Sequence, residues 1–307
     1  MKLEFKGVFP APPTPVTSDG RVHEKALRAL LEDNIAHGAN GFWMAGSTGE
    51  GPILTDEQRD TVARVSAEVC AGRALVIMHV GAMSTASAVK AAKTAREAGC
   101  AGVCCLPPLF FPSTDRSRID YYKAVADAGG DLPFFVYNLP QLTQVEILPA
   151  FMEQLVREIP TLRGLKHSAP NFAHIRVFAD MGLMCFSGNG ALPLPALTMG
   201  AVGTIDAPLA LAPWHYAELY RAWDAGDMAR AQALQDSVRT YVDLVWMFNA
   251  FADVCKVVLS QRLGIDCGRS IPPVNRLNDE QRREVLRVAD SLGLTAQRAR
   301  SVAAAVE

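Results

Sequence analysis

Short apolar runs alternate with segments of helical periodicity along most of the chain, and this alternation constrains the fold most strongly. The runs combine apolar residues on both strand faces, as strands covered on both sides do. We expect strands at residues 7–10, 41–45, 74–79, 102–106, 133–137, in a run that ends at 166, at 184–187 and at 202–205. Helices are expected at 24–37, 55–70, 84–98, 118–128, 147–158 and 192–199. Eight such units are the number found in a parallel (β/α)8 TIM barrel, which is the α/β fold that we predict.

Two further observations delimit this predicted barrel. A doubly wound open sheet is the alternative, but it usually needs a glycine-rich first turn, which is absent after Pro10. After Pro213 the periodicity becomes purely helical, and residues 264–278 are rich in Gly and Pro, as loops are. Helices are expected at 214–225, 228–263 and 279–304. We therefore expect a catalytic barrel at 1–226 and a C-terminal helical region at 227–307.

Composition excludes several classes of protein. Half of the residues are apolar, a fifth are charged, and the formal net charge is -2, which is typical of a soluble globular protein. The chain lacks the excess of basic residues that would indicate nucleic-acid or membrane-surface binding, and its apolar runs are too short to span a membrane. Residues 1–6 lack the apolar core of a signal peptide. We expect a cytoplasmic protein that binds neither nucleic acid nor membranes.

The cysteines and histidines do not show the spacing of a metal site. The seven cysteines form no Cys-x-x-Cys pair, and the six histidines form neither His-Glu-x-x-His nor His-x-His. Cys104 and Cys105 are adjacent on an expected strand, so their side chains would point to opposite faces and cannot bind one ion. We therefore expect buried, reduced thiols and no metal.

One lysine ends the sixth expected strand. Lys166 follows a short apolar run, just where the chain must turn. Strand interiors are depleted in lysine, and burial drives an ammonium group to lose its proton, which makes the amine nucleophilic. A neutral lysine amine can attack a carbonyl carbon and form a Schiff base. The alternative is a lysine that extends from the strand end and keeps its charge in water. The segment alone leaves both interpretations open.

Polar residues also follow the second and fifth expected strands. Residues 46–51 combine small side chains, two hydroxyls and backbone N–H groups, which suit a carboxylate or a phosphate. The alternative is an ordinary loop before the helix that Thr55 begins. Tyr137 ends the fifth strand, where its phenol either packs in the core or relays protons beside a Schiff-base lysine. Because the C-terminal ends of barrel strands meet at one mouth, we expect these groups to lie near Lys166.

Three motifs at these strand ends resemble those of the dihydrodipicolinate synthase and N-acetylneuraminate lyase family. They are Gly-Ser-Thr-Gly-Glu at 46–50, Tyr-Asn-Leu-Pro at 137–140 and Gly-Leu-Lys at 164–166. The resemblance covers nearly the whole chain, including the helical tail. It implies a metal-independent class I aldolase that handles pyruvate, uses no cofactor and assembles as a homotetramer.

The resemblance also implies roles for individual residues. Lys166 would form the Schiff base with the keto carbon of pyruvate or another 2-oxo acid, and Tyr137 would relay protons to and from the acceptor oxygen. The positions that match substrate-binding residues of the family are Ser47, Thr48, Gly188 and Ile205. The serine and threonine would hold the carboxylate with their hydroxyls and backbone N–H groups, and the other two would line the same pocket through their backbone.

Departures from the family pattern bear on the substrate. In the synthase branch a neighbouring subunit supplies an aromatic hydroxyl to the proton relay, but Phe110 stands at the corresponding place here. The synthase also has a carboxylate-binding arginine where this chain has Leu142, and an apolar residue there fits the lyase branch. Sialic acid lyases carry acidic residues after the seventh strand, whereas this chain has Gly190 and Ala191. We expect a lyase-like aldolase that cleaves or forms the bond between pyruvate and an aldehyde. Its substrate is expected to be a 2-oxo acid other than sialic acid, either a sugar acid or a less polar analogue.

Other functions remain open at this point. The alternatives are a 4-hydroxy-tetrahydrodipicolinate synthase, a dehydratase of 2-keto-3-deoxy sugar acids, and a regulatory barrel that binds an oxo acid without catalysis. The presence of both Lys166 and Tyr137 speaks against the last, since a binding module needs no nucleophile. Lys256, the other lysine in an apolar setting, is expected at a rim or an interface, and His79 and His167 are expected to be structural.

Overall fold

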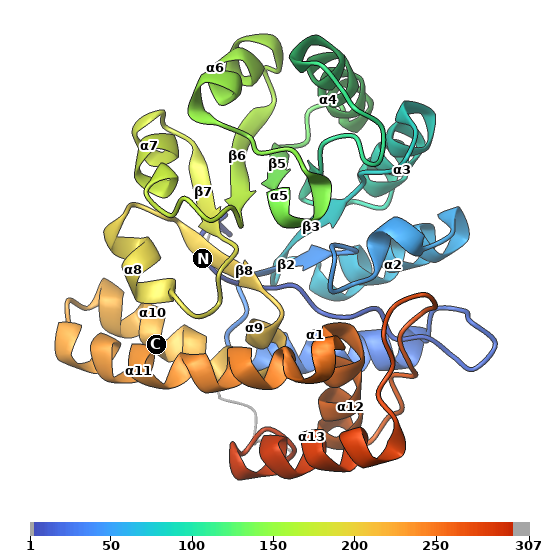
Figure 1. Cartoon of the computed structure of the whole chain (residues 1–307), viewed down its shortest axis with the longest axis vertical. Coiled ribbons are helices and arrows are strands. Elements are labelled where there is room, and N and C mark those ends of the chain that lie inside the picture. Colours follow the sequence, from blue (N-terminus) through green and yellow to red (C-terminus); the bar gives the residue numbers. More distant parts are fainter. Residues whose placement is uncertain (1–2, 297–307) are drawn as a thin grey trace.

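The central feature of the computed structural model is a sheet of eight parallel strands in the order β1, β8, β7, β6, β5, β4, β3, β2. The structure describes residues 3–296. The strands are β1 (Gly7–Pro10), β2 (Gly41–Met44), β3 (Leu75–His79), β4 (Gly102–Cys105), β5 (Phe134–Asn138), β6 (Leu162–His167), β7 (Met184–Ser187) and β8 (Gly203–Asp206). They lie at the centre of the molecule with helices around them (Figure 1). The predicted (β/α)8 TIM barrel is confirmed.

Asn40 joins the first and last strands of this sheet, β1 and β2. Its backbone N–H donates to the Val8 carbonyl oxygen at 2.9 Å, and its side-chain oxygen accepts from the Val8 backbone N–H at 2.8 Å. At Gly41 an added Cβ would lie only 2.2 Å from the ring of Phe9, so a larger residue there would force the two strands apart. These contacts bring the sheet nearly to closure and cover its edges.

Two apolar layers fill the space on either side of the strands. Because successive side chains of a strand point to opposite faces, alternate residues belong to different layers. The layer inside the barrel consists of Phe9, Ala11, Trp43, Ile77, Cys104, Leu106, Phe135, Tyr137, Phe186 and Ile205. The larger layer packs the outward faces of the strands against the helices. All seven cysteines are buried, as predicted.

The barrel helices largely follow the predicted periodicity. They are α1 (Glu24–Ala36), α2 (Asp56–Cys70), α3 (Thr85–Glu97), α4 (Asp115–Gly129), α5 (Pro140–Thr143), α6 (Pro149–Glu158), α7 (His174–Asp180), α8 (Pro193–Thr198), α9 (Pro208–Leu211) and α10 (Pro213–Asp224). The predicted capping box at Thr55 begins α2. A second one, made by Thr114 and Ser117, begins α4 before the predicted residue 118. The short helices α5, α7 and α9 were not expected.

The C-terminal region contains α11 (Met228–Val245), α12 (Phe251–Leu263) and α13 (Asp279–Ser291) within the described residues. The prediction of one helix over 228–263 is wrong, because Phe248 and Asn249 adopt left-handed conformations, with φ of 58° and 51°, and break it. Residues 264–278 form the predicted loop. The helix predicted at 279–304 ends at Ser291, and its last part, from residue 297, lies outside the described residues.

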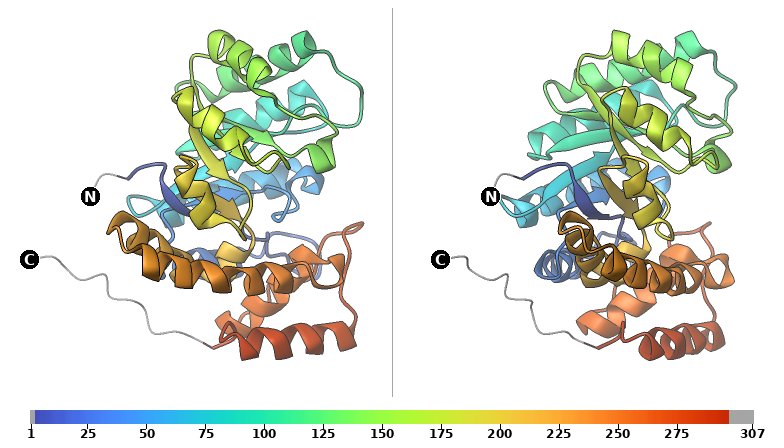
Figure 2. Two further views of the ribbon diagram at one scale, coloured as in Figure 1. Left: turned by 60° about the vertical axis from the view of Figure 1, so that its left-hand side comes forward. Right: turned by 90° about the vertical axis from the view of Figure 1, so that its left-hand side faces the viewer.

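The helices α11, α12 and α13 lie on the same side of the barrel as α1 (Figure 2). The predicted domain boundary between residues 226 and 227 falls between α10 and α11 and stays a prediction. None of the helices in residues 3–296 combines the length and the apolar character that crossing a bilayer requires.

Candidate active site

Lys166 points into the barrel from the penultimate position of β6. Its side chain is only 4% exposed, so the alternative of a lysine extended into water is wrong. In the register of the sheet Lys166 lies directly opposite Tyr137 of β5. The Lys166 Nζ donates a hydrogen bond to the Tyr137 hydroxyl at 3.0 Å and lies 4.5 Å from the centroid of that ring. The register of β5 and β6 therefore places an amine and a phenol together inside the barrel.

The phenol of Tyr137 links this amine to the loop after β2. Its hydroxyl lies 3.2 Å from Ser47 Oγ, and either group can be the donor. The ring is buried and meets the rings of Trp43 and His79 edge-on, with centroid distances of 5.5 Å and 6.2 Å. A continuous chain of hydrogen bonds thus runs from Lys166 through Tyr137 to Ser47. Such a chain can carry a proton between the amine and a molecule bound at the mouth.

The loop over residues 45–51 is a tight turn with special backbone geometry. Ala45 and Glu50 are non-glycine residues with φ of 51° and 57°, and such conformations are costly for residues that have a Cβ. Gly51 packs so closely that an added Cβ would lie 1.6 Å from the Ala45 carbonyl oxygen. The Thr14 hydroxyl donates a hydrogen bond to the Gly49 carbonyl oxygen at 2.7 Å. Ser47, partly exposed, and Thr48, buried, are held on this turn.

A buried ion pair fixes the far end of the same turn. The Lys256 ammonium of α12 lies 2.5 Å from a Glu50 carboxylate oxygen, and both side chains are fully buried. Lys256 also donates to the Arg269 carbonyl oxygen at 2.9 Å, and the other Glu50 oxygen accepts from the Ile271 backbone N–H. Burial raises the pKa of Glu50, and the charge of Lys256 acts in the opposite direction. Lys256 therefore joins α12 to the turn, and its expected place at a rim or an interface stays a prediction.

The two backbone positions predicted in the pocket also lie in or beside the barrel interior. An added Cβ at Gly188, after β7, would meet Lys166 Cε at 3.1 Å and Ser168 Oγ at 1.9 Å. Ile205 of β8 is fully buried in the interior layer that contains Tyr137. All six predicted site residues thus belong to the barrel interior or to the loops at its C-terminal end. Their roles in binding and catalysis stay predictions.

Asp206 is a carboxylate at this mouth that sequence reasoning missed. It ends β8, and its oxygens accept hydrogen bonds from the backbone N–H groups of Gly190 and Ala207, both at 2.8 Å. Burial raises the pKa of Asp206, and the charge of Lys166 opposes this rise. The signal was present, because Asp206 directly follows the apolar run predicted as the eighth strand.

The two histidines near the mouth have structural partners. His79 Nδ1 lies 3.0 Å from the Ala45 carbonyl oxygen, and Nε2 accepts from the Leu106 backbone N–H at 3.4 Å. Burial lowers the pKa of His79 to about 3, so the ring is neutral near pH 7. His167 faces outward, with one ring nitrogen 3.2 Å from Asn138 Nδ2 and the other 3.0 Å from the Asn171 carbonyl oxygen. These contacts agree with the structural roles that we expected.

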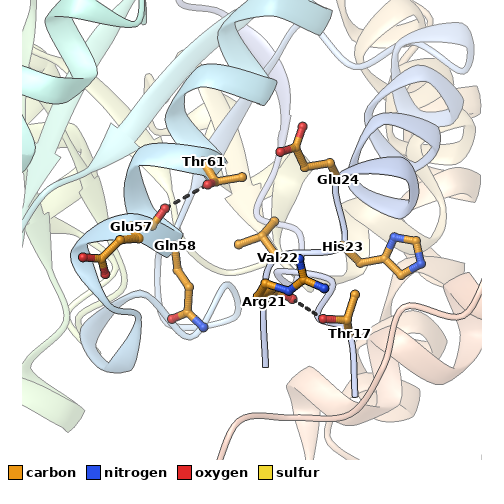
Figure 3. A pocket seen from close by; sticks show the side chains of 8 residues that line it. All are labelled: Thr17, Arg21, Val22, His23, Glu24, Glu57, Gln58 and Thr61. Atoms are coloured by element: carbon orange, nitrogen blue, oxygen red, sulfur yellow. Dashed lines mark hydrogen bonds between the residues drawn. The ribbon is translucent and has the colours of Figure 1, made fainter. Parts of the chain in front are cut away.

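Two hollows on the surface lie away from Lys166. One, of about 400 Å³, lies between the segment before α1 and the first turns of α2 (Figure 3). The other, of about 600 Å³, lies beside the first turns of α13. Neither contains a predicted site residue, and the first contains no buried nucleophile. The candidate site is therefore the region around the Lys166 amine rather than either of these hollows. Within residues 3–296, no group of three or more His, Cys, Asp or Glu side chains is arranged to hold a metal ion.

Comparison with known proteins agrees with this geometry. The model of the dihydrodipicolinate synthetase family matches residues 4–292. A 4-hydroxy-tetrahydrodipicolinate synthase from Syntrophus aciditrophicus is 31% identical over 294 residues, which cover 94% of this chain and 99% of the relative. An N-acetylneuraminate lyase from Citrobacter koseri is 30% identical over 253 residues, which cover 82% of this chain and 85% of the relative.

A solved structure supports the same assignment. YagE, a prophage protein of the dihydrodipicolinic acid synthase family from E. coli K12 in complex with pyruvate, is 25% identical and has a TM-score of 0.88. The match covers 94% of this chain and 99% of that protein. Relatives of both names match at nearly the same identity, so the comparisons support the synthase and the lyase branch equally. The chain belongs to the dihydrodipicolinate synthetase family, whose members are pyruvate-dependent lyases and synthases.

Proposed function

We propose that this protein is a class I aldolase in which Lys166 forms a Schiff base with pyruvate or another 2-oxo acid. The observation that carries the proposal is the 3.0 Å hydrogen bond from Lys166 Nζ to the Tyr137 hydroxyl inside the barrel. Lysine amines that attack carbonyl groups need a desolvated setting and a partner that moves protons, and this pair supplies both. Ser47, 3.2 Å from the same hydroxyl, connects the pair to the turn that would hold the substrate carboxylate.

The geometry suits cleavage of a carbon–carbon bond. The Lys166 amine attacks the keto carbon, and loss of water gives a protonated imine. The imine accepts the electron pair of the breaking bond while the substrate hydroxyl loses its proton, so that an aldehyde leaves and an enamine of pyruvate remains. Protonation of the enamine carbon and hydrolysis of the imine then release pyruvate and restore the amine. Tyr137 relays protons in these steps, and condensation follows the same path in reverse.

We further propose that the substrate is a 2-oxo sugar acid other than N-acetylneuraminate. The match to a lyase supports the cleavage reaction. Gly190 and Ala191 supply no carboxylate to a polyol chain, and Leu142 supplies no guanidinium to a second carboxylate. A 4-hydroxy-tetrahydrodipicolinate synthase is the second candidate, because a relative of that name is 31% identical over nearly its whole length. Dehydration of a 2-keto-3-deoxy sugar acid would use the same imine.

A homotetramer in the cytoplasm also stays part of the proposal. The family resemblance motivates the tetramer. Exposed apolar side chains on the loop after β4 and on α5, namely Phe110, Phe111 and Leu142, are suited to contact another copy of the chain.

A panel of 2-oxo acids tests the substrate. Each compound is incubated with the protein, and released pyruvate is measured, with Lys166→Arg protein as the blank. We expect release from at least one hydroxylated 2-oxo acid and faster release from it than from N-acetylneuraminate. Faster cleavage of N-acetylneuraminate than of every other compound would refute the proposed substrate class. Condensation of pyruvate with aldehydes but no cleavage would favour the synthase.

A further inference from the structure

Trp43 carries a buried hydrogen-bond donor that has no partner in the described part of the chain. It is the third residue of β2, and its side chain is fully buried in the layer inside the barrel. The indole Nε1 makes no hydrogen bond within residues 3–296. Buried N–H groups are almost always paired, because an unpaired donor loses its hydrogen bond to water on folding and gains none in the protein. A ligand or an ordered water molecule is therefore expected to accept this hydrogen bond.

The indole ring lies beside the two groups of the proposed chemistry. The centroid of the Trp43 ring is 5.8 Å from Lys166 Nζ. Its plane is nearly perpendicular to that of the Tyr137 ring, at a centroid distance of 5.5 Å. The Tyr137 hydroxyl in turn contacts both Lys166 and Ser47. Trp43 thus forms part of the wall around the position that a molecule attached to Lys166 would occupy.

The N–H edge of this ring faces the turn after β2. An added Cβ at Gly46 would meet Trp43 Cδ1 at 3.0 Å and Nε1 at 3.2 Å, so the polar edge of the indole lies against the second residue of the turn. Ser47 and Thr48 follow directly, and they are the residues proposed to hold the substrate carboxylate. The unpaired donor therefore lies next to the proposed carboxylate site.

We propose that Trp43 is a substrate-binding residue whose indole N–H donates a hydrogen bond to the carboxylate of the bound 2-oxo acid. This role rests on the proposed Schiff-base function. An indole N–H can only donate and an ionised carboxylate can only accept, so the two groups are complementary. Hydrogen bonds to a charged acceptor are about twice as strong as neutral ones. Trp43 would therefore contribute to affinity for the acid and to selection of a charged carboxylate over a neutral ester.

Trp43→Phe tests this role, because it removes the N–H group and keeps an aromatic ring. The matched control is Trp246→Phe, since Trp246 is 57% exposed and follows α11, outside the interior layer of the barrel. The trapped adduct is measured after borohydride reduction at increasing pyruvate concentrations. We expect the half-saturating pyruvate concentration to rise about ten-fold in Trp43→Phe, the loss typical of one hydrogen bond to a charged group, and to stay unchanged in Trp246→Phe.

Methyl pyruvate separates binding from a structural effect. This ester forms the same imine but has no charged carboxylate, so we expect Trp43→Phe to weaken it only about three-fold. An equal loss for pyruvate and its ester would overturn the proposal, because a distorted barrel weakens both ligands alike. Unchanged half-saturation for pyruvate would also overturn it and would indicate that a water molecule accepts the hydrogen bond.

Wild-type protein supplies a measurement that does not depend on how the variant folds. In a crystal structure of the reduced pyruvate adduct, we expect a carboxylate oxygen within hydrogen-bond distance of Trp43 Nε1. A water molecule at that place instead would overturn the role of Trp43 and leave the Schiff base intact. If wild-type protein forms no adduct with pyruvate, the Schiff-base function itself fails, and this role fails with it.

Discussion

The amine of Lys166 and the phenol of Tyr137 meet because neighbouring strands place them at paired positions. This meeting could be predicted from the sequence, since both residues end apolar runs and strand ends converge at the barrel mouth. The contact with Ser47 could not be predicted as a distance, because it depends on the left-handed conformation at Ala45, which is not glycine. The unpaired donor of Trp43 was equally hidden, since a tryptophan in an apolar run is typical of a core.

Substitution of Lys166 and Tyr137 should affect different steps. Lys166→Arg should abolish turnover and adduct formation, because guanidinium stays protonated near pH 7.

Tyr137→Phe should lower kcat by about 10²- to 10⁴-fold, the usual contribution of a positioned proton shuttle, while an adduct still forms. The matched control is Tyr220→Phe, a buried phenol whose hydroxyl lies 2.8 Å from Thr204 Oγ1 on the outer side of β8. Normal kcat in Tyr137→Phe would contradict the relay.

Stability should fall in acid partly because of His79. Its folded-state pKa is lowered to about 3 by burial, whereas an unfolded histidine titrates near 6.5. Below about pH 6.5 the imidazole is therefore protonated in the unfolded state but stays neutral in the folded state. The contribution of His79 to the free energy of unfolding is complete above that pH and is lost as pH falls toward 3. Between pH 7 and 5 the free energy of unfolding should drop by about 2 kcal/mol from this residue.

His79→Gln isolates this contribution. A glutamine amide can keep the hydrogen bonds to the Ala45 carbonyl oxygen and the Leu106 N–H but does not titrate. Urea unfolding of wild type and variant at pH 7 and pH 5 measures the difference. An identical drop in the two proteins would show that His79 is not protonated selectively in the unfolded state.

At the scale of elements, the buried ion pair between Lys256 and Glu50 holds α12 and the turn after β2 together. The sequence could not reveal this pair, because the partners are 206 residues apart and nothing local to either predicts the contact. The same holds for the break between α11 and α12, which depends on left-handed Phe248 and Asn249 rather than on glycine or proline. The strands, by contrast, could be predicted because burial on both faces leaves a clear apolar run.

Breaking this pair should destabilise the protein and loosen the turn. Lys256→Met should lower the free energy of unfolding by about 3–5 kcal/mol, since it leaves a buried carboxylate without its partner. It should also raise the KM for pyruvate, because Glu50 is in the turn that carries Ser47 and Thr48. Urea denaturation and steady-state kinetics measure the two effects.

Lys90→Met is the matched control for Lys256→Met. The Lys90 ion pair with Asp56 has the same charges at 2.8 Å, but both side chains are about half exposed. Exposed pairs contribute only about 0–1 kcal/mol, so stability should change little. Equal losses of stability in the two variants would contradict the expectation that the buried Lys256 ion pair stabilises the protein more than the exposed Lys90 pair.

At the scale of the whole molecule, we propose that exposed aromatic rings beside the barrel mouth contact another copy of the chain. Phe110 and Phe111, on the loop after β4, are 84% and 69% exposed, and their rings pack edge-on at 5.0 Å. We expect a homotetramer in sedimentation velocity, and a smaller species when both residues are replaced by serine. The control is Met228→Ser, an exposed apolar residue at the start of α11. A wild-type monomer would contradict this expectation.

The barrel as a whole explains why residues from distant parts of the chain share one site. Ser47 follows β2, whereas Tyr137 and Lys166 lie near the ends of β5 and β6, and the parallel sheet brings the ends of these strands to one mouth. The substrate could not be read in the same way, because it depends on loop shapes that residues such as Leu142 and Gly190 only constrain.

The formation of a covalent adduct on Lys166 tests this account most directly. Wild-type protein is treated with pyruvate and borohydride, and the intact mass and the modified peptide are determined by mass spectrometry. We predict one reduced pyruvate adduct per chain, located on Lys166 and absent from Lys166→Arg. An unmodified wild-type chain, or an adduct on another lysine such as Lys256, would contradict the proposed function.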